Sequence, residues 1–459
     1  MSSTTYRLTC LSPVHIGTGQ QWSKFDGAYH EGRWYVVDLD RVFALGVDGN
    51  ELAQAMSSGA FSWAEWLRGR RISPEQVALY SLPCALPPGE VYIREGIKDV
   101  YLRPYIPATT LKGAVRTAIV WYLLRHDEQA QAFTRRYLIL AVYAKDIGQI
   151  VNRLAKGNRQ AEEDPQLHLR AIREALELDD AQEAEAFLQT LYRALGKHLE
   201  GARRGDRYER VRMRDIRELG SDRRFLALPV ERYLLGKDPN HDLLRVLQVG
   251  DSETTSLEQM EVGLVWTYHL NQSGRLQPKR EQGMEYKSLA EWLKPETSVR
   301  LSLRIDESLL GEQANKVLKF KPTQQQAIRR LPEVCNSYAR SVIGRQKEYV
   351  TRHHQPQLQA FYNQLQQRLD SLPGGAFLLN IGWGGGWEAK TVGDIVQEIL
   401  HDDDYDDFGE LRKRYKLGEN PQTNRINPDA PFPETRLVAY QGAAAAYPLG
   451  WVLLEPEKG

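Results

Sequence analysis

The sequence has few cysteines and no long apolar run. Cys10, Cys84 and Cys335 are far apart and odd in number, so they form neither a disulfide framework nor a zinc-ligand spacing. No signal-peptide pattern opens the sequence, and no apolar run approaches the roughly 20 residues of a membrane helix. We therefore expect a soluble cytoplasmic protein without disulfides and without a membrane partner.

An excess of charge of either sign is also missing. The 60 Lys and Arg residues balance 60 Asp and Glu residues, which gives a formal net charge of zero. This balance excludes a strong global attraction to nucleic acid, so any such contact must come from local patches. With 459 residues, the chain exceeds what one hydrophobic core usually supports, and two or three domains are expected.

Motifs of the common catalytic classes are missing as well. The sequence holds no nucleophile elbow, HExxH helix, CxxC pair or kinase signature. The acidic run at 401–407 lacks the residue order of a calcium loop, so it predicts an exposed loop. The arginine-rich stretch at 201–217 is interrupted by acidic residues, which is typical of a solvated helical face. We expect no metal, no cofactor and a binding protein that is not an enzyme.

The order of strand-like and helix-like segments predicts an α+β fold. The first hundred residues have strand and turn patterns, residues 224–310 return to strand character, and 447–455 is a final strand. Strands and helices do not alternate regularly, which favours antiparallel sheets with helices on one face. We expect ferredoxin-like or RNA-recognition-type sheet domains with large helical insertions.

These segments also predict a domain organisation. Residues 1–120 together with 221–310 are expected to form an N-terminal RNA-recognition-like domain. Residues 121–220, with an amphipathic stretch at 179–201, are predicted to be a helical insertion. Residues 311–459 are predicted to form a C-terminal region of helices and a glycine loop.

Two glycine-rich segments carry candidate binding chemistry. SPVHIGTG (12–19) runs from a strand into Gly17 and Gly19, and GWGGGWEAKT (382–391) holds four glycines within five residues. Glycines let backbone amides face a phosphate, although tight turns that need positive φ explain the same residues. Trp383 and Trp387 offer flat faces for stacking on bases, or else anchor the core.

A third segment, YIPATTLKGAVRTA (105–118), predicts a helix with cations near its start. Its apolar residues recur at helical spacing, and the threonines at 109 and 110 are placed to cap it. Lys112 and Arg116 are four residues apart and share one face. With the positive end of the helix dipole they would form a phosphate cradle, and the alternative is a capped helix with two solvated cations.

In this order, the three segments resemble the RAMP superfamily of CRISPR-associated proteins. More narrowly, they resemble the fifth subunit of the type III-A Csm effector complex. HDLLRVLQVGDS (241–252), FPETRLV (432–438) and PLGWVLL (448–454) also resemble segments of that family, so the resemblance spans nearly the whole chain. The chain departs from it at Ala108–Thr110, where relatives commonly have Gly-Ser-Ser.

The resemblance implies a non-catalytic subunit at the end of the backbone filament in an antiviral ribonucleoprotein. Such a subunit holds the 3′ part of the guide RNA and supports guide maturation by recruited host nucleases. Guide RNA, target RNA and the other Csm backbone subunits are its implied partners. The RNA contacts carried over by motif are His15, Gly17, Gly19, Thr110, Lys112, Arg116, Gly384, Gly385, Gly386 and Trp387.

Two enzymatic alternatives stay open on the sequence. Related backbone subunits cleave target RNA with an aspartate after the first strand and a divalent ion, and Asp26 follows the Gly19 turn by seven residues. The competing interpretation is that Asp26 supports a turn. His15 is the candidate base of a metal-independent ribonuclease that processes repeat RNA.

Overall fold

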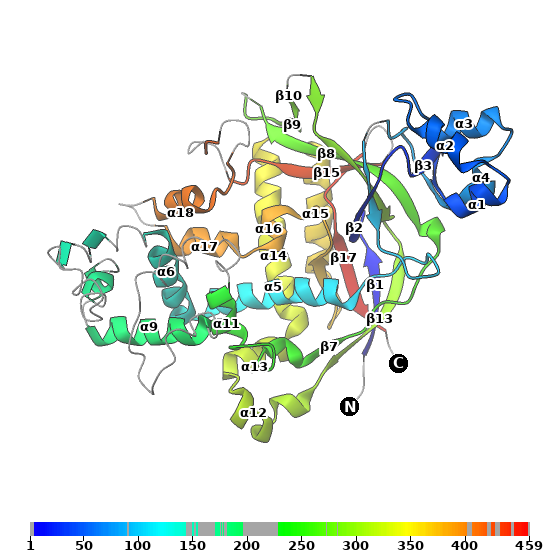
Figure 1. Ribbon diagram of the computed structural model, residues 1–459. Coiled ribbons are helices and arrows are strands. Elements are labelled where there is room, and N and C mark those ends of the chain that lie inside the picture. The colour runs from blue at the N-terminus through cyan, green and yellow to red at the C-terminus, as the bar shows by residue number, and fades with distance from the viewer. Residues whose placement is uncertain are drawn as a thin grey trace.

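Strand β1 (Thr4–Cys10) lies at the centre of a five-stranded sheet in the computed structural model of the protein (Figure 1). Its alternating sequence buries Tyr6, Leu8 and Cys10 on one face. The sheet has the order β14–β17–β1–β13–β7, and all neighbouring strands are antiparallel. Its other strands are β7 (Leu247–Val249), β13 (Ser298–Ile305), β14 (Phe377–Asn380) and β17 (Trp451–Pro456).

The structure describes most of the chain. The described residues are 4–89, 91–143, 149–150, 153–154, 170–174, 176, 178, 181–195, 228–271, 273–281, 283–401, 406–419, 424–426, 432–441 and 445–457. The arginine-rich stretch at 201–217 and most of the acidic run at 401–407 lie outside them.

Four strands of this sheet and two helices make a ferredoxin-like unit. Helix α5 (Ala108–His126) lies between β1 and β7 in the chain, and α14 (Leu331–Arg352) lies between β13 and β17. The two helices pack against each other and against the sheet, which confirms the predicted fold class. Since β1 pairs with both β13 and β17, the predicted boundary at residue 310 separates strands that share one sheet.

A second sheet has the order β16–β15–β8–β12–β6–β2, and β9 adds to β8. Its neighbours are antiparallel except for β12 and β6, which are parallel. Gly263 in β8 lets the indole of Trp292 lie on the backbone, because a Cβ there would lie 1.6 Å from that ring. The strands are β2 (Gly17–Trp22), β6 (Ile93–Gly96), β8 (Met260–Leu270), β9 (Leu276–Pro278), β12 (Lys287–Leu293), β15 (Arg436–Gln441) and β16 (Ala445–Tyr447).

A small lobe with its own core connects β2 to β6, and Figure 1 shows it in blue beside the sheets. The sequence predicted only strands and turns here, and that was wrong, because four short helices follow the first strands. Asp38 and Asp48 cap two of them by accepting backbone N–H bonds. The lobe contains β3 (Gly27–His30), β4 (Arg33–Val37), α1 (Leu39–Ala44), α2 (Gly49–Met56), α3 (Trp63–Gly69), α4 (Pro74–Val77) and β5 (Ala78–Pro83).

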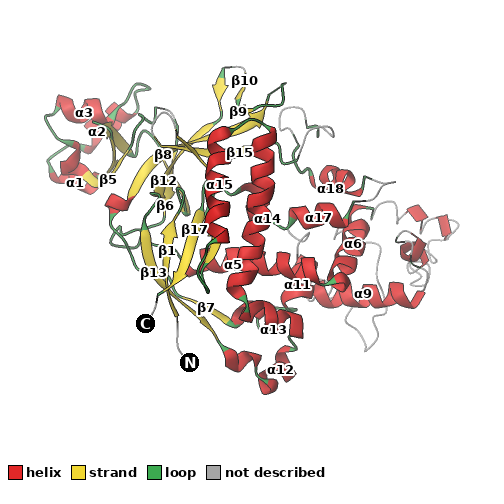
Figure 2. Ribbon diagram, turned by 180° about the vertical axis from the view of Figure 1, so that it is seen from behind, coloured by secondary structure: helices red, strands yellow, loops and turns green. Residues whose placement is uncertain are grey.

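Helices cover the side of the molecule opposite the small lobe (Figure 2). Helix α15 (Pro356–Asp370) runs beside α14, and the predicted amphipathic stretch contains α9 (Ala181–Leu195). In the described part of the chain, no helix is both long and apolar enough to cross a bilayer. The remaining helices and hairpin strands are α6 (Glu128–Val142), α11 (Leu228–Leu235), β10 (Arg280–Glu281), β11 (Met284–Glu285), α12 (Glu312–Leu318), α13 (Pro322–Arg329), α16 (Gly386–Lys390), α17 (Gly393–Ile399) and α18 (Asp407–Tyr415).

Candidate functional site

Three segments that are distant in the sequence meet in one place, which we call the glycine-loop cluster (residues 12–19, 381–386 and 448–450). The N–H of Trp383 donates to the carbonyl of His15 at 2.8 Å. The N–H of Gly450 donates to Pro13 at 2.9 Å, and the N–H of Ile381 donates to Gly450 at 2.7 Å. The structure therefore brings SPVHIGTG and GWGGGW together and adds the PLGW turn.

Close approach explains most glycines of this cluster, while Gly19 and Gly386 meet open space and have positive φ angles. A Cβ on Gly382, where φ is +68°, would lie 2.3 Å from the carbonyl oxygen of His15. A Cβ on Gly385 would lie 2.2 Å from Oδ1 of Asn380. Within the described residues, the N–H groups of Gly384 and Gly385 donate to no acceptor, so both are available to a ligand.

His15 fixes the cluster from inside. Its side chain is buried, and its Nδ1 donates to the carbonyl of Glu291 at 2.7 Å. Burial lowers the pKa of His15, so the ring is neutral near pH 7. The ring edge contacts Trp383 at a centroid distance of 5.6 Å, and a Cβ on Gly17 would lie 2.9 Å from its Nε2. His15 thus positions both glycine loops.

Arg94 of β6 is a cation beside the cluster that the sequence did not reveal. Its guanidinium lies 4.8 Å from the centre of the Trp383 ring. Arg94 has no carboxylate partner among the described residues, and its Nε is buried without a hydrogen bond. No local motif marks this arginine, because the tryptophan that holds it is almost 300 positions away.

Beneath the cluster, a buried carboxylate ties several strands together. Glu291 is fully buried and accepts hydrogen bonds from Tyr80 at 2.7 Å and from the N–H of Gly96 at 2.9 Å. Lys98 lies 2.6 Å from the same carboxylate, and Trp22 donates to it at 3.2 Å. The charge of Glu291 is therefore paired, and this group holds β6 and β12 in place.

The helix that carries Thr110, Lys112 and Arg116 has internal partners. The predicted threonine cap is wrong: the cap position is Pro107, without a side-chain cap bond. Asp251 accepts instead from the N–H of Ala108 at 2.7 Å, because the segment 241–252 packs against the helix start.

Both cations of this helix bind acceptors of the protein itself. Lys112 donates to the carbonyl of Leu247 at 3.0 Å, and burial lowers its pKa. Arg116 bonds to Glu231 at 3.1 Å and to Asp242 at 2.8 Å. The structure thus gives Lys112 and Arg116 a packing role, and their phosphate contact stays a prediction.

Asp26 closes a turn. Its Oδ2 accepts from both the N–H and the hydroxyl of Ser23 at 2.7 Å, and its own N–H donates to the Ser23 carbonyl at 3.0 Å. No group of three or more His, Cys, Asp or Glu side chains among the described residues has the spacing of a metal site.

Lys390 supports the glycine loop from below. Its Nζ donates to the carbonyl of Asn380 at 2.9 Å, and its Cε would be 2.9 Å from a Cβ on Gly385. Burial without an acidic partner lowers the pKa of Lys390 to about 7.

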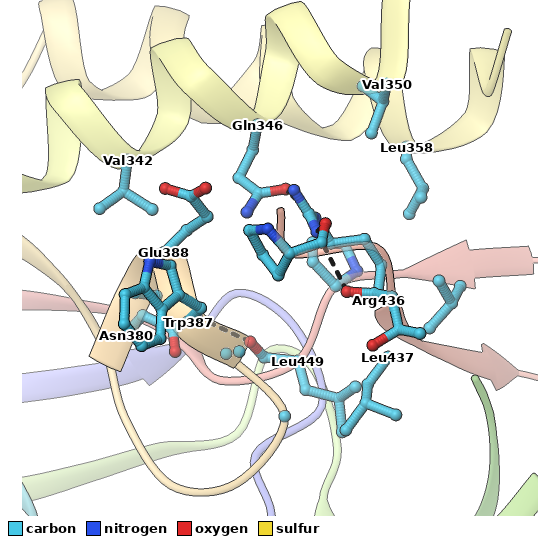
Figure 3. A pocket seen from close by; sticks show the side chains of 18 of the residues that line it. Val342, Gln346, Val350, Leu358, Asn380, Trp387, Glu388, Arg436, Leu437 and Leu449 are labelled. Carbon is cyan, nitrogen blue, oxygen red and sulfur yellow. Dashed lines mark hydrogen bonds between the residues drawn. The ribbon is translucent and has the colours of Figure 1, made fainter. Parts of the chain in front are cut away.

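Trp387 packs inward. Its ring meets Phe432 edge to face at 5.0 Å, and a Cβ on Gly393 would lie 2.0 Å from its Nε1. The indole borders a cavity of about 330 Å³ between the glycine loop, α14 and β15 (Figure 3).

Comparison with known proteins identifies the family. A model of the RAMP superfamily matches residues 7–434, so the chain belongs to the RAMP superfamily. A chain in the cryo-EM structure of a "Csm-crRNA-target RNA ternary complex in type III-A CRISPR-Cas system" shares 21% sequence identity with a TM-score of 0.59, covering 99% of this chain and 100% of that chain. The crystal structure of T. onnurineus Csm5 shares 21% identity with a TM-score of 0.52, covering 97% and 99%.

A search of curated proteins found no match. At 21% identity, the two solved structures establish a shared fold along nearly the whole chain. The predicted resemblance to the RAMP superfamily is confirmed by the family match.

Proposed function

We propose that the chain is the fifth backbone subunit of a type III-A CRISPR effector complex, a non-catalytic cytoplasmic protein. It holds the 3′ part of the guide RNA, contacts neighbouring Csm subunits and supports guide maturation by recruited nucleases. Membership of the RAMP superfamily and the two Csm-type structural neighbours support this proposal.

The observation that carries the RNA contact is the glycine-loop cluster. It combines the N–H groups of Gly384 and Gly385, which have no acceptor among the described residues, with Arg94, which has no carboxylate partner among them. Amides and a guanidinium together suit a phosphate, and they need no excess of charge over the whole chain. His15, Gly17 and Gly19 shape the cluster, while Thr110, Lys112 and Arg116 are secondary candidates for contact.

Arg94→Gln tests the contact, with Arg68→Gln as the matched control. Arg68 is exposed on α3 of the small lobe, so both variants lose one positive charge. Guide RNA binding to the purified chain is measured by filter binding from low to moderate salt. We expect Arg94→Gln to weaken binding. The plot of log binding constant against log salt should become less steep by about 0.7, the value for one lost phosphate contact to a single strand.

Two results would count against the proposal. One is a wild-type chain that binds guide RNA neither alone nor in its complex. The other is an Arg94→Gln variant whose affinity and salt slope equal those of Arg68→Gln, which would remove the cluster from the RNA path.

A further inference from the structure

The cavity beside the glycine loop lies where three of the family-like segments meet. Its volume of about 330 Å³ is at the lower end of the range for small-ligand pockets, roughly 300–1,000 Å³. Figure 3 shows Gln346 pointing from α14 into this space, above Trp387 and Leu449. The lining includes Val342 and Gln346 from α14, Leu358 from α15, Trp387 from α16, Arg436 from β15, and Leu449.

The polar group that faces the cavity is the Gln346 amide. The Nε1–H of Trp387 and the Oδ1 of Asn380 form no hydrogen bond within the described residues, but both are enclosed by the protein, against Gly393 and Gly385. Asn380 is only 7% exposed. The amide oxygen of Gln346 accepts from Arg436 at 3.0 Å, while its Nε2 donates to no group in the described part of the chain. This amide donor is therefore available to a ligand in the cavity.

Glu388 beside the cavity is paired with an opposite charge, whereas Arg436 has only neutral partners among the described residues. Arg436 bonds to Gln346 and to the carbonyl of Pro433 at 2.8 Å, and its guanidinium lies 3.9 Å from the centre of the Tyr349 ring. Glu388 accepts from Arg345 at 2.8 Å. The cavity therefore offers the Gln346 amide and the Arg436 guanidinium between apolar walls and the Trp387 ring, which suits a planar heterocycle with acceptor atoms.

We infer that this cavity binds a nucleobase, taken from the RNA strand held by the glycine-loop cluster. The inference rests on the proposed function, because Gly384 and Gly385 line the cavity and also present the free amides to the backbone. A nucleotide whose phosphate meets these amides can place its base against the Trp387 ring and the Gln346 donor. Stacking and edge contacts of one base are worth roughly 1–3 kcal/mol, enough to fix one nucleotide in register.

Val342→Phe tests the inference, because the larger ring takes up space in the cavity from the side of α14. The matched control is Val317→Phe, at a position on α12 that is 66% exposed. We expect Val342→Phe to weaken guide RNA binding about fivefold or more at an unchanged salt slope, since no phosphate contact is lost. Gln346→Leu, which removes the amide at similar size, is the second variant if Val342→Phe melts well below the control.

Photo-cross-linking identifies the base directly. Guide RNA carrying a single thio-substituted base is irradiated with the full chain, and the cross-linked peptides are mapped. We expect one position to cross-link to 384–391 or 433–438, and Val342→Phe to lose that cross-link. In parallel, saturation-transfer NMR measures the binding of the four free nucleosides to the chain. A saturation-transfer signal that Val342→Phe abolishes would show that the cavity also binds free nucleosides.

The outcomes separate the two proposals. If the wild-type chain binds RNA but no cross-link maps to the cavity, no nucleoside binds and Val342→Phe has normal affinity, the cavity proposal is wrong and the RNA-binding function stands. If the chain binds no RNA, the proposed function fails, and the nucleoside arm alone decides whether the cavity takes a base.

Discussion

Lys390 makes the stability of the protein depend on pH in a defined direction. Its pKa is lowered from 10.5 to about 7 by burial, whereas the unfolded chain keeps the ordinary value. Between these two values the unfolded chain binds one more proton than the folded chain, so the free energy of unfolding rises with pH. One pKa unit is about 1.4 kcal/mol, so the step from pH 7 to pH 9 contributes roughly 2 kcal/mol.

The variant Lys390→Met isolates this contribution, since it keeps the length of the side chain and cannot titrate. Urea unfolding followed by tryptophan fluorescence is measured for wild type and variant at pH 7 and pH 9. We expect the difference between the two proteins to change by roughly 2 kcal/mol in favour of wild type at the higher pH. The exposed Lys237→Met is the control and should track wild type. Equal differences at both pH values would refute the buried, unpaired state of Lys390.

Three further substitutions probe the packing, each by its urea midpoint. Glu291→Gln removes the nearer carboxylate of the buried Lys98, which keeps Glu95 at 3.8 Å, and should cost about 1.5–3 kcal/mol, so a wild-type midpoint would contradict that pairing. Gly263→Ala drives a methyl group into Trp292 and should cost about 3 kcal/mol or more, and a neutral effect would disprove that contact. Gly113→Ala meets open space inside α5 and should stabilise by about 0.5–1 kcal/mol, whereas destabilisation would show a hidden contact.

Local patterns in the sequence were sufficient for much of the fold. The spacing of Leu111, Val115 and Ile119 predicted the buried face of α5, and the structure buries all three. The alternation in the first strand predicted β1, and the lack of regular strand–helix alternation led to the antiparallel class. Each of these predictions depends on the repeat of a helix or a strand, which a short stretch of sequence shows by itself.

What the sequence could not show are partnerships across long separations. The acceptor for the first N–H of α5 is Asp251, 143 residues beyond Ala108, so the prediction that the nearby threonines cap this helix was wrong. The pairing of β1 with β17 joins the two ends of the chain, and no local signal sets its register. Arg94 became a candidate only because the fold places it on Trp383.

The glycine loops were recognised from sequence, but their meeting was not. The glycines at 382 and 385 indicated that a side chain would not fit at these positions, but the sequence did not show which groups lie against them. The structure supplies the answer in the His15 carbonyl, which approaches from a distant segment, and in the Asn380 amide, at the end of the strand that leads into the loop.

The central claim is that the glycine-loop cluster holds guide RNA within a multi-subunit complex. The most direct measurement purifies the tagged chain from its native host after ultraviolet cross-linking, sequences the bound RNA and maps the attached peptides. We predict co-purifying Csm-type subunits and short RNAs with a uniform 5′ end, cross-linked within 12–19 or 381–391. A chain that purifies without RNA, or with RNA attached only elsewhere, would contradict it.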